Sequence, residues 1–188
     1  MHRLLLAGEV IHADETRIQV LHEEGRKATA ESKMWVYCNG KLNDRSIVIF
    51  DYKPTRKGEN AQTFLKGFDG YLVRDGYSGY HVVTGVKHCG CMTHVRRYFV
   101  NVLPKDKSAQ ETSVAAEAVR YFDWIYHEEN LLSGMTAEER YEQRLAKVKP
   151  LLDAFFAWLD RQNPVKGSRF DKAVTYIRNR KPYLLTYL

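Results

Sequence analysis

The sequence predicts an α/β fold in which a mixed β-sheet is followed by a helical region. Four short segments before residue 81 have the alternation or the β-branched and aromatic content of strands, and one segment among them has helical spacing. From Ser108 onward the apolar residues recur at helical spacing. At 188 residues the chain is long enough for one domain with a large insertion. We therefore expect a β-β-β-α-β core within residues 1–107 and a helical insertion or extension over residues 108–188.

The first predicted strand, residues 10–20, carries a carboxylate where an apolar residue would be expected. Side chains alternate between the two faces of a strand, so Asp14 shares its face with a largely apolar row. That row consists of Val10, His12, Thr16, Ile18 and Val20, and the other face carries Ile11, Ala13, Glu15 and Arg17. An unpaired buried carboxylate is costly, so such an acid is normally exposed at a strand end, hydrogen-bonded, or bound to a metal ion. This strand alone leaves the three interpretations open.

A second carboxylate ends another apolar row. In the segment 70–80, Asp75 is aligned with Tyr71 and Val73 and is followed at once by a Gly-rich turn. Two strands that each bring one aspartate to a shared sheet suit a divalent-metal phosphoryl-transfer site, because carboxylate oxygens hold hard cations. Asp14 and Asp75 are therefore the candidate metal ligands.

The segments between the two aspartates predict the rest of the sheet. Residues 34–38 and 46–52 are expected to be strands joined by a turn at residues 39–41, which gives an antiparallel meander with the first strand. Residues 60–68 have helical spacing and are followed by glycine, so this helix would cross over to the strand of Asp75. The order places the first and fourth strands side by side.

The region from Ser108 is expected to pack through apolar helical stripes. Thr136 and Glu139 form a capping box, and Pro150 either kinks a helix or begins a new one. A loop is expected at residues 162–168 and a last helix from about Arg169. Aromatic stripes at this spacing are typical of a core rather than of a cofactor site.

Composition limits the class of protein. Hydrophobic residues make up 44% and charged residues 28% of the chain, and no apolar run approaches the roughly 20 residues that span a bilayer. The apolar stretch near the first residue is too short for a signal peptide. Three cysteines do not provide a disulfide framework, which fits a reducing compartment. We therefore expect a cytoplasmic protein without a membrane segment.

The net charge of +6 is unevenly distributed. Residues 76–107 hold five basic side chains and one acidic one. Such a patch beside a metal site suits a polyanionic substrate, although a merely solvated basic surface has the same composition. The candidate DNA contacts are Lys87, His94, Arg96 and Arg97. Neighbouring arginines cannot face the same way on a helix, so one could contact a phosphate while the other pairs with an acid, or both could be solvated.

Two cysteines and two histidines, His88, Cys89, Cys91 and His94, are close in sequence. They invite a zinc interpretation. A structural zinc site, however, generally has two separated ligand pairs, and the sequence offers no second pair. We therefore expect the cysteines to serve packing.

Three motifs carry a family resemblance: the segments 12–16 (HADET), 72–80 (LVRDGYSGY) and 91–99 (CMTHVRRYF). In order and spacing they resemble the catalytic region of bacterial transposases of the insertion sequence 66 family. The resemblance implies a ribonuclease H-like domain whose DDE triad binds two Mg²⁺ or Mn²⁺ ions and cuts and joins DNA. It makes Asp14 the first acid and Asp75 the second, with transposon ends and target DNA as partners and a homo-oligomer in the complete transposase.

The chain also departs from this family pattern. The third acid of the family is a glutamate in an Asn-rich stretch, which we expect just beyond Leu188, and the upstream zinc-binding and helix-turn-helix regions are not in the sequence. The acids Glu117, Glu138, Glu139, Glu142 and Asp171 do not match the motif, so none is assigned. We expect a transposase fragment that is weak or inactive alone. The alternatives are a non-catalytic remnant that binds DNA or a sister transposase, and a different metal-dependent nuclease on the same fold.

Overall fold

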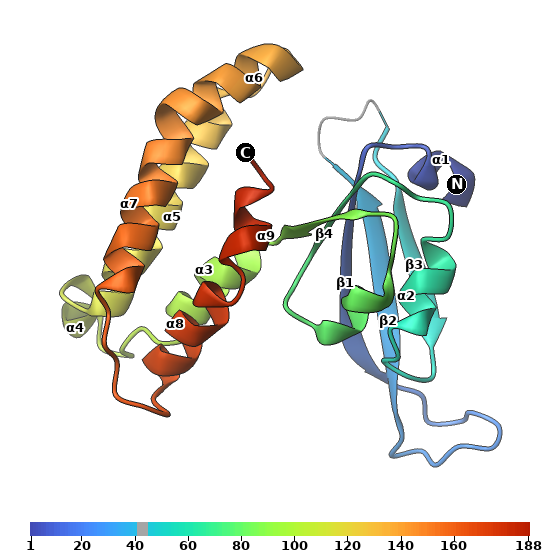
Figure 1. Ribbon diagram of the computed structural model, residues 1–188. Helices are drawn as coiled ribbons and strands as arrows, with labels where there is room; N and C mark the ends of the chain where they lie inside the picture. The colour runs from blue at the N-terminus through green and yellow to red at the C-terminus, as the bar shows by residue number, and fades with distance from the viewer. Residues whose placement is uncertain (41–44) are drawn as a thin grey trace. The chain divides into compact units, whose positions relative to one another are not determined.

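The computed structural model describes residues 1–40 and 45–188 (Figure 1). The chain divides into two compact units, residues 1–90 and 91–188, here called the sheet unit and the helical unit. The units divide between Gly90 and Cys91, whereas the sequence suggests a functional division after Lys107. That functional division stays a prediction.

The sheet unit contains one five-stranded mixed sheet. Its elements are α1 (His2–Leu6), β1 (Val10–Gln19), β2 (Glu31–Asn39), β3 (Val48–Lys53), α2 (Glu59–Phe64), β4 (Tyr71–Arg74), the 3₁₀-helix η1 (Ser78–Val82) and β5 (Lys87–Gly90). The strand order is β3-β2-β1-β4-β5, in which β1, β2 and β3 form an antiparallel meander and β4 is parallel to both β1 and β5. The predicted meander and the predicted contact between the first and fourth strands are confirmed. Of the expected turn at residues 39–41, Lys41 lies outside the described residues.

The core of the sheet unit lies on one face of the sheet. Buried strand residues on this face are Ile11, Ala13, Trp35, Tyr37 and Leu72, and they pack with Leu5, Ala61, Leu65, Phe68 and Tyr80 from the helices and connections. The aromatic rings contact each other closely, with Trp35 and Tyr80 edge to face at 5.7 Å and Tyr37 stacked on Phe64 at 3.8 Å. The helix α2 stops at Phe64, earlier than expected, and a positive φ of 88° at Gly67 follows it.

The face of β1 that carries Asp14 is not the buried face. The buried row of β1 is the alternate one, which contains Ile11, Ala13 and the Glu15 side chain, whereas Asp14 and His12 are exposed. The reason is that α1, α2 and η1 all pack on the face of Ile11 and Ala13. Asp14 is therefore accessible to a ligand from solvent.

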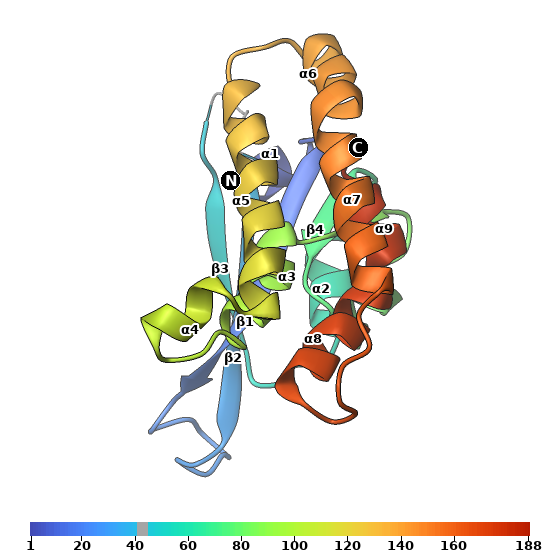
Figure 2. The ribbon, with the colours of Figure 1, turned by 90° about the vertical axis from the view of Figure 1, so that its left-hand side faces the viewer.

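The helical unit follows without strands among the described residues. Its elements are α3 (Met92–Val100), α4 (Lys107–Glu111), α5 (Val114–Leu131), α6 (Ala137–Gln143), the π-helix η2 (Arg144–Val148), α7 (Lys149–Asp160), α8 (Arg169–Arg178) and α9 (Lys181–Leu185). The rod formed by α6, η2 and α7 runs alongside α5 in both ribbon views (Figure 2), and Arg144 joins the two by bonds of 2.9 and 3.0 Å to Glu129. The predicted helical region is confirmed.

Local sequence signals explain where these helices begin. Thr136 and Glu139 form the predicted capping box, and the hydroxyls of Ser113 and Ser168 accept hydrogen bonds at the starts of α5 and α8. Pro150 is the second residue of α7 and closely follows the π-helix η2, so the chain stays helical on both sides of it. The helices pack around a buried aromatic cluster that includes Phe99, Phe122, Phe155, Phe156 and Trp158.

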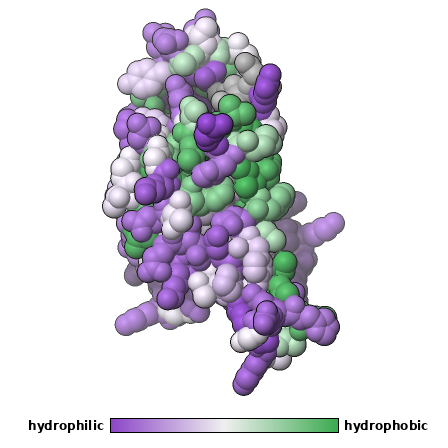
Figure 3. Space-filling model, turned by 90° about the vertical axis from the view of Figure 1, so that its right-hand side faces the viewer, coloured by the Kyte–Doolittle hydropathy of each residue, from purple (hydrophilic) through white to green (hydrophobic). Residues whose placement is uncertain are grey.

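On the face shown in Figure 3, apolar areas lie among polar ones. The exposed large apolar side chains of the sheet unit include Met1, Leu4, Val48 and Phe50. Within residues 1–40 and 45–188, none of the helices combines the length and the apolar character that crossing a bilayer requires.

Candidate active site

The pairing of β1 with β4 ends two residues before each of the two predicted aspartates. The strands are parallel, and Val10, Ile11 and His12 pair with Tyr71, Leu72 and Val73 in that order. Continued by two residues, this register aligns Asp14 with Asp75, which directly follows β4. Neighbouring strands lie about 4.8 Å apart, and residues in register share a face. Both carboxylates therefore belong to the face of the sheet opposite the core.

Backbone hydrogen bonds orient both carboxylates. Asp14 Oδ1 accepts a hydrogen bond of 2.9 Å from the backbone N–H of Glu15. Asp75 is half-buried, and its Oδ1 accepts a bond of 2.8 Å from the backbone N–H of Tyr77, which forms a turn that Asp residues favour. Arg74 Nη1 donates to the Asp75 carbonyl at 3.0 Å. The turn that follows β4 therefore holds Asp75 by its own backbone.

A buried carboxylate on the opposite face of β1 connects this turn to the rest of the sheet unit. The Glu15 side chain is only 1% exposed and accepts hydrogen bonds from the Arg56 guanidinium and, at 2.8 Å, from the hydroxyl of Tyr80. The Arg56 guanidinium also lies over the ring of Tyr77, 3.8 Å from its centroid, and the Tyr77 hydroxyl donates to the Arg56 carbonyl. We call Glu15, Arg56, Tyr77 and Tyr80 the Glu15 brace.

The electrostatics of the brace follow from its burial. Burial raises the pKa of Glu15 above its ordinary value, and the negative charge of Asp75 raises it further. The hydrogen bonds from Tyr80 and Arg56 lower this pKa but do not cancel the effect of burial. Burial also raises the pKa of the Tyr80 hydroxyl, as does the negative charge of Glu15. The Tyr80 hydroxyl therefore stays protonated and acts as a donor to the carboxylate.

Two glycines allow the segments of the brace to approach each other. A Cβ at Gly58, which follows Arg56 in the β3–α2 connection, would collide with the backbone carbonyl of Gly79. A Cβ at Gly79 would collide with the ring of Tyr77. Only glycine fits at these positions, so the β3–α2 connection is fixed directly against the turn that carries Asp75.

The predicted DNA contacts are divided between the two units, with Lys87 in the sheet unit and the other three residues in the helical unit. Lys87 pairs with Tyr71, at the beginning of β4, while Asp75 follows the end of that strand. Its ammonium lies 4.8 Å from the centroid of the Tyr71 ring. Four residues of strand separate Lys87 from the level of Asp75, a span of about 13 Å.

The other predicted contacts lie on α3 in the helical unit. Arg96 donates to Asp123 by bonds of 3.1 and 2.9 Å, whereas Arg97 is exposed and its side chain has no ion pair among the described residues. His94 is half-buried and bonds to Cys91. Burial raises the pKa of the Cys91 thiol, but the hydrogen bonds and charge of His94 outweigh it, so that this pKa lies below its ordinary value. Arg97 is thus the α3 side chain that is best placed for a phosphate.

The donor set at Asp14 and Asp75 suits a hard cation. No group of three or more His, Cys, Asp and Glu side chains within the described part of the chain is arranged to hold a metal ion. Magnesium is usually bound in proteins through one or two carboxylates, with water and substrate phosphates as further ligands. Two aspartates are therefore a sufficient protein contribution for that ion.

Sequence reasoning identified the two aspartates but missed the Glu15 brace. The alternation of side chains along β1 could have indicated a buried Glu15, because Glu15 lies on the same face as the apolar residues Ile11 and Ala13. The partners Arg56 and Tyr80 are distant in sequence, so only the folded chain identifies them.

Comparison with known proteins identifies the family of this chain. The model of the family described as Transposase IS66 family matches residues 1–188. The uncharacterized protein y4hP of Sinorhizobium fredii is 26% identical over 200 residues, which cover 94% of this chain and 35% of y4hP. The uncharacterized protein y4jD of the same organism is 28% identical over 186 residues, which cover 88% of this chain and 34% of y4jD.

The chain spans about a third of the length of these curated relatives. No solved structure matches it. The family match extends over every residue, including the three motifs that suggested the resemblance and both aspartates of the β1–β4 pair. This chain belongs to the IS66 transposase family.

Proposed function

We propose that the sheet unit forms part of the DNA cleavage and joining site of a transposase, in which Asp14 and Asp75 hold a divalent cation. The observation that carries this proposal is the parallel register of β1 and β4, which leads the two aspartates to one face of the sheet. The strand order β3-β2-β1-β4-β5 supports a ribonuclease H-like arrangement. Membership of the IS66 transposase family supports DNA as the substrate.

The two carboxylates have separate tasks. Asp14 is exposed, so a phosphodiester can approach it from solvent. Asp75 accepts the Tyr77 N–H through Oδ1, which leaves Oδ2 as its ligand atom. The two carboxylates would hold a magnesium or manganese ion, which would supply positive charge to the reacting phosphate and lower the pKa of a bound water.

The Glu15 brace acts as the support of this site. It ties β1, the β3–α2 connection and the turn after Asp75 together through bonds on the core face. A metal site requires its ligands to be held close to their binding geometry by supporting contacts. The brace therefore fixes the spacing of Asp14 and Asp75 without contacting the substrate.

The test is Mn²⁺ affinity, measured by titration calorimetry on the 188-residue chain. Asp14→Asn and Asp75→Asn each remove a charged ligand, and we expect each to weaken Mn²⁺ binding by about tenfold to a hundredfold or more. Asp69→Asn is the matched control, because Asp69 is an exposed acid of the same unit outside the site. It should leave the affinity unchanged.

The DNA arm of the test uses a duplex that carries the transposon end. The proposal requires the affinity for this duplex to rise when Mn²⁺ is added, and to rise only in chains that retain both aspartates. Wild-type Mn²⁺ affinity in both variants would contradict the proposal. DNA affinity that depends on salt but not on Mn²⁺ would favour a non-catalytic DNA-binding remnant instead.

A further inference from the structure

A second segment with a large excess of positive charge lies in the helical unit. Residues 161–181 hold seven of the 29 basic side chains and one of the 23 acidic ones. The remaining residues are therefore balanced, with 22 of each sign. The segment runs from the end of α7 through the connecting loop and α8 to the start of α9.

The rest of the helical region has the opposite charge. Residues 108–160 contain five basic and ten acidic side chains. Several of these cations are neutralised locally, as in the pairs Arg144 with Glu129 and Lys149 with Asp153. Residues 108–188 as a whole therefore have nearly equal numbers of basic and acidic side chains, although the acidic ones are concentrated in residues 108–160 and the basic ones in residues 161–181.

Four of the seven cations are available for an external partner. Arg161, Lys166, Arg169 and Lys172 are exposed, and none of their side chains has a hydrogen bond or an ion pair among the described residues. We call these four residues the α8 basic surface. The other three have structural roles: Arg178 donates to the carbonyls that end α7, Arg180 lies over the Tyr176 ring, and Lys181 pairs with Asp160 at 3.8 Å.

The single acid of the segment does not neutralise this surface by an ion pair. Asp171 Oδ2 accepts a hydrogen bond of 2.8 Å from the backbone N–H of Gly167, and its own N–H donates to the Ser168 hydroxyl. The Asp171 carboxylate therefore lies at the first turn of α8, where a negative charge stabilises the helix.

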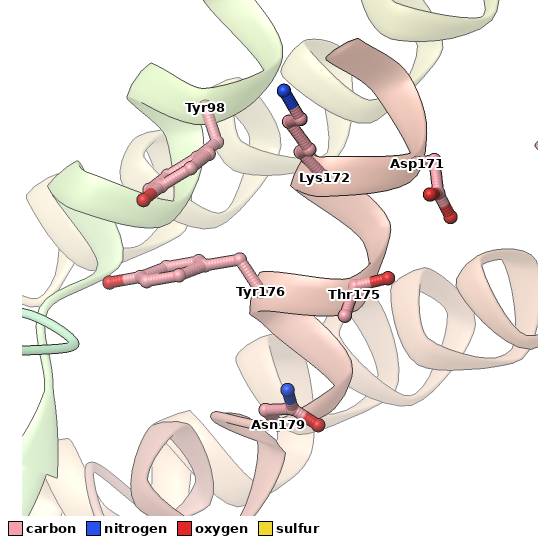
Figure 4. A pocket seen from close by; sticks show the side chains of 6 residues that line it. All are labelled: Tyr98, Asp171, Lys172, Thr175, Tyr176 and Asn179. Carbon is pink, nitrogen blue, oxygen red and sulfur yellow. The ribbon is translucent and has the colours of Figure 1, made fainter. Parts of the chain in front are cut away.

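The exposed face of α8 continues this surface with polar and aromatic side chains. Arg169, Lys172, Tyr176 and Asn179 follow the spacing of one helical face, and Ala173, Val174 and Ile177 on the other face are buried. A shallow hollow of about 460 Å³ lies beside this face and is lined by Tyr98, Asp171, Lys172, Thr175, Tyr176 and Asn179. Figure 4 shows the rings of Tyr98 and Tyr176 side by side, stacked at 4.0 Å.

We propose that the α8 basic surface binds the phosphate backbone of duplex DNA. The charge excess complements a polyanion, and unpaired Lys and Arg side chains supply most of the affinity of proteins for DNA without reading its sequence. Tyr, Thr and Asn side chains, such as those around the hollow, are the neutral groups that commonly contact phosphate and sugar. This inference rests on the proposed function, because the substrate of a transposase is DNA, but it concerns residues remote in sequence from Asp14 and Asp75.

The test compares two triple variants that remove equal charge. One variant carries Lys166→Gln, Arg169→Gln and Lys172→Gln. The control carries Arg3→Gln, Lys27→Gln and Lys147→Gln, which are exposed basic residues outside the α8 basic surface and outside residues 76–107, and without ion pairs among the described residues. Affinity for a short duplex of random sequence is measured in EDTA over a series of salt concentrations, and circular dichroism verifies the fold of each variant.

We expect the α8 variant to bind duplex at least about tenfold more weakly, and its slope of log affinity against log salt to fall by about 2 to 3. The control should keep the wild-type slope. Equal losses in both variants would overturn the proposal, because the effect would then reflect net charge alone.

The EDTA condition separates this proposal from the metal site. Because EDTA removes Mn²⁺, duplex binding under this condition does not depend on a cation at Asp14 and Asp75. If the wild type binds duplex and the α8 variant retains the full slope, the α8 basic surface is excluded while the proposed active site stands. If Mn²⁺ binding proves independent of Asp14 and Asp75, the loss in the α8 variant would still support this surface.

Discussion

The two units of the chain use charged side chains in opposite ways. The sheet unit buries the Glu15 carboxylate, which accepts hydrogen bonds from Arg56 and Tyr80. Glu15 belongs to the same strand as Asp14 but lies on its opposite face. The helical unit has an apolar and aromatic core and keeps its lysines and arginines at or near the surface. A buried polar network fixes geometry at the cost of desolvation, whereas an apolar core supplies stability with less directional constraint. The difference fits the proposal that the sheet unit holds the metal site and the helical unit presents positive charge to DNA.

The largest expected effect comes from the core of the helical unit. Phe155 is 1% exposed and contacts the rings of Phe99, Phe122 and Trp158. Phe155→Ala should lower the free energy of unfolding by about 3–5 kcal/mol, because it removes apolar contacts and leaves a cavity. Urea titration followed by circular dichroism measures this change, with the exposed Tyr141→Ala as control. A loss below about 1 kcal/mol would mean that Phe155 is not central to this core.

The next effect distinguishes two cysteines that flank the boundary between the units. Burial raises the pKa of Cys89, on β5, to about 11. His94 holds the pKa of Cys91 below the ordinary value of 9.0, although burial alone would raise it. Because the thiolate is the reactive form, Cys91 should react with iodoacetamide at pH 8 about a hundredfold faster than Cys89.

Mass spectrometry of the alkylated peptides measures the alkylation rates of Cys89 and Cys91 across a pH series. The rate at Cys91 should reach half its maximum below pH 9.0, and His94→Ala should move that midpoint upward. Equal rates at the two cysteines, or no effect of His94→Ala, would contradict the assigned environments.

The Glu15 brace gives the next largest effect on stability. Glu15→Ala leaves the fully buried Tyr80 hydroxyl and part of the Arg56 guanidinium without their acceptor. The expected loss is about 1–3 kcal/mol of unfolding free energy. The matched control is Glu24→Ala, an exposed acid of the same unit, which should change stability by no more than about 0.5 kcal/mol. If the two variants were equally stable, Glu15 would not brace the unit.

The smallest effect concerns the start of α8. The Ser168 hydroxyl accepts the N–H of Asp171 at 3.0 Å, so Ser168→Ala removes one cap from this helix. We expect a loss of about 1 kcal/mol in urea titration. Thr175→Ala, on the exposed face of the same helix, should cost less than Ser168→Ala. A reversed order would show that the cap does not stabilise α8.

Much of the fold could be predicted because local signals and global packing agree. The meander, the crossover to the Asp75 strand and the Thr136 capping box are all encoded by patterns within a few residues. The face of β1 that is buried could not be chosen from its own alternation, because Val10 and Ile18 are apolar on one face and Ile11 and Ala13 on the other. The packing of α2 decides it, and that contact is not local.

The candidate site was predictable in part for the same reason. Asp14 lies within a recognisable strand pattern, Asp75 ends an apolar row, and the family motifs contain both. The partners of the Glu15 brace and the location of Lys87 at the far end of β4 depend on strand register, which a single sequence does not specify. The positive charge of residues 161–181 can be counted in the sequence. A count over residues 108–188 does not show it, because the acidic residues of 108–160 balance it.

The central claim, that Asp14 and Asp75 share one cation, is tested most directly by paramagnetic broadening of backbone amide resonances by Mn²⁺. A stoichiometric amount of Mn²⁺ should broaden the amides of residues 13–16 and 74–77 together, because the register of β1 and β4, continued by two residues, aligns the two aspartates. In Asp14→Asn the broadening should disappear from both segments at once. Broadening that persists in both segments of Asp14→Asn would contradict the claim, because Asp75 would then hold Mn²⁺ without Asp14.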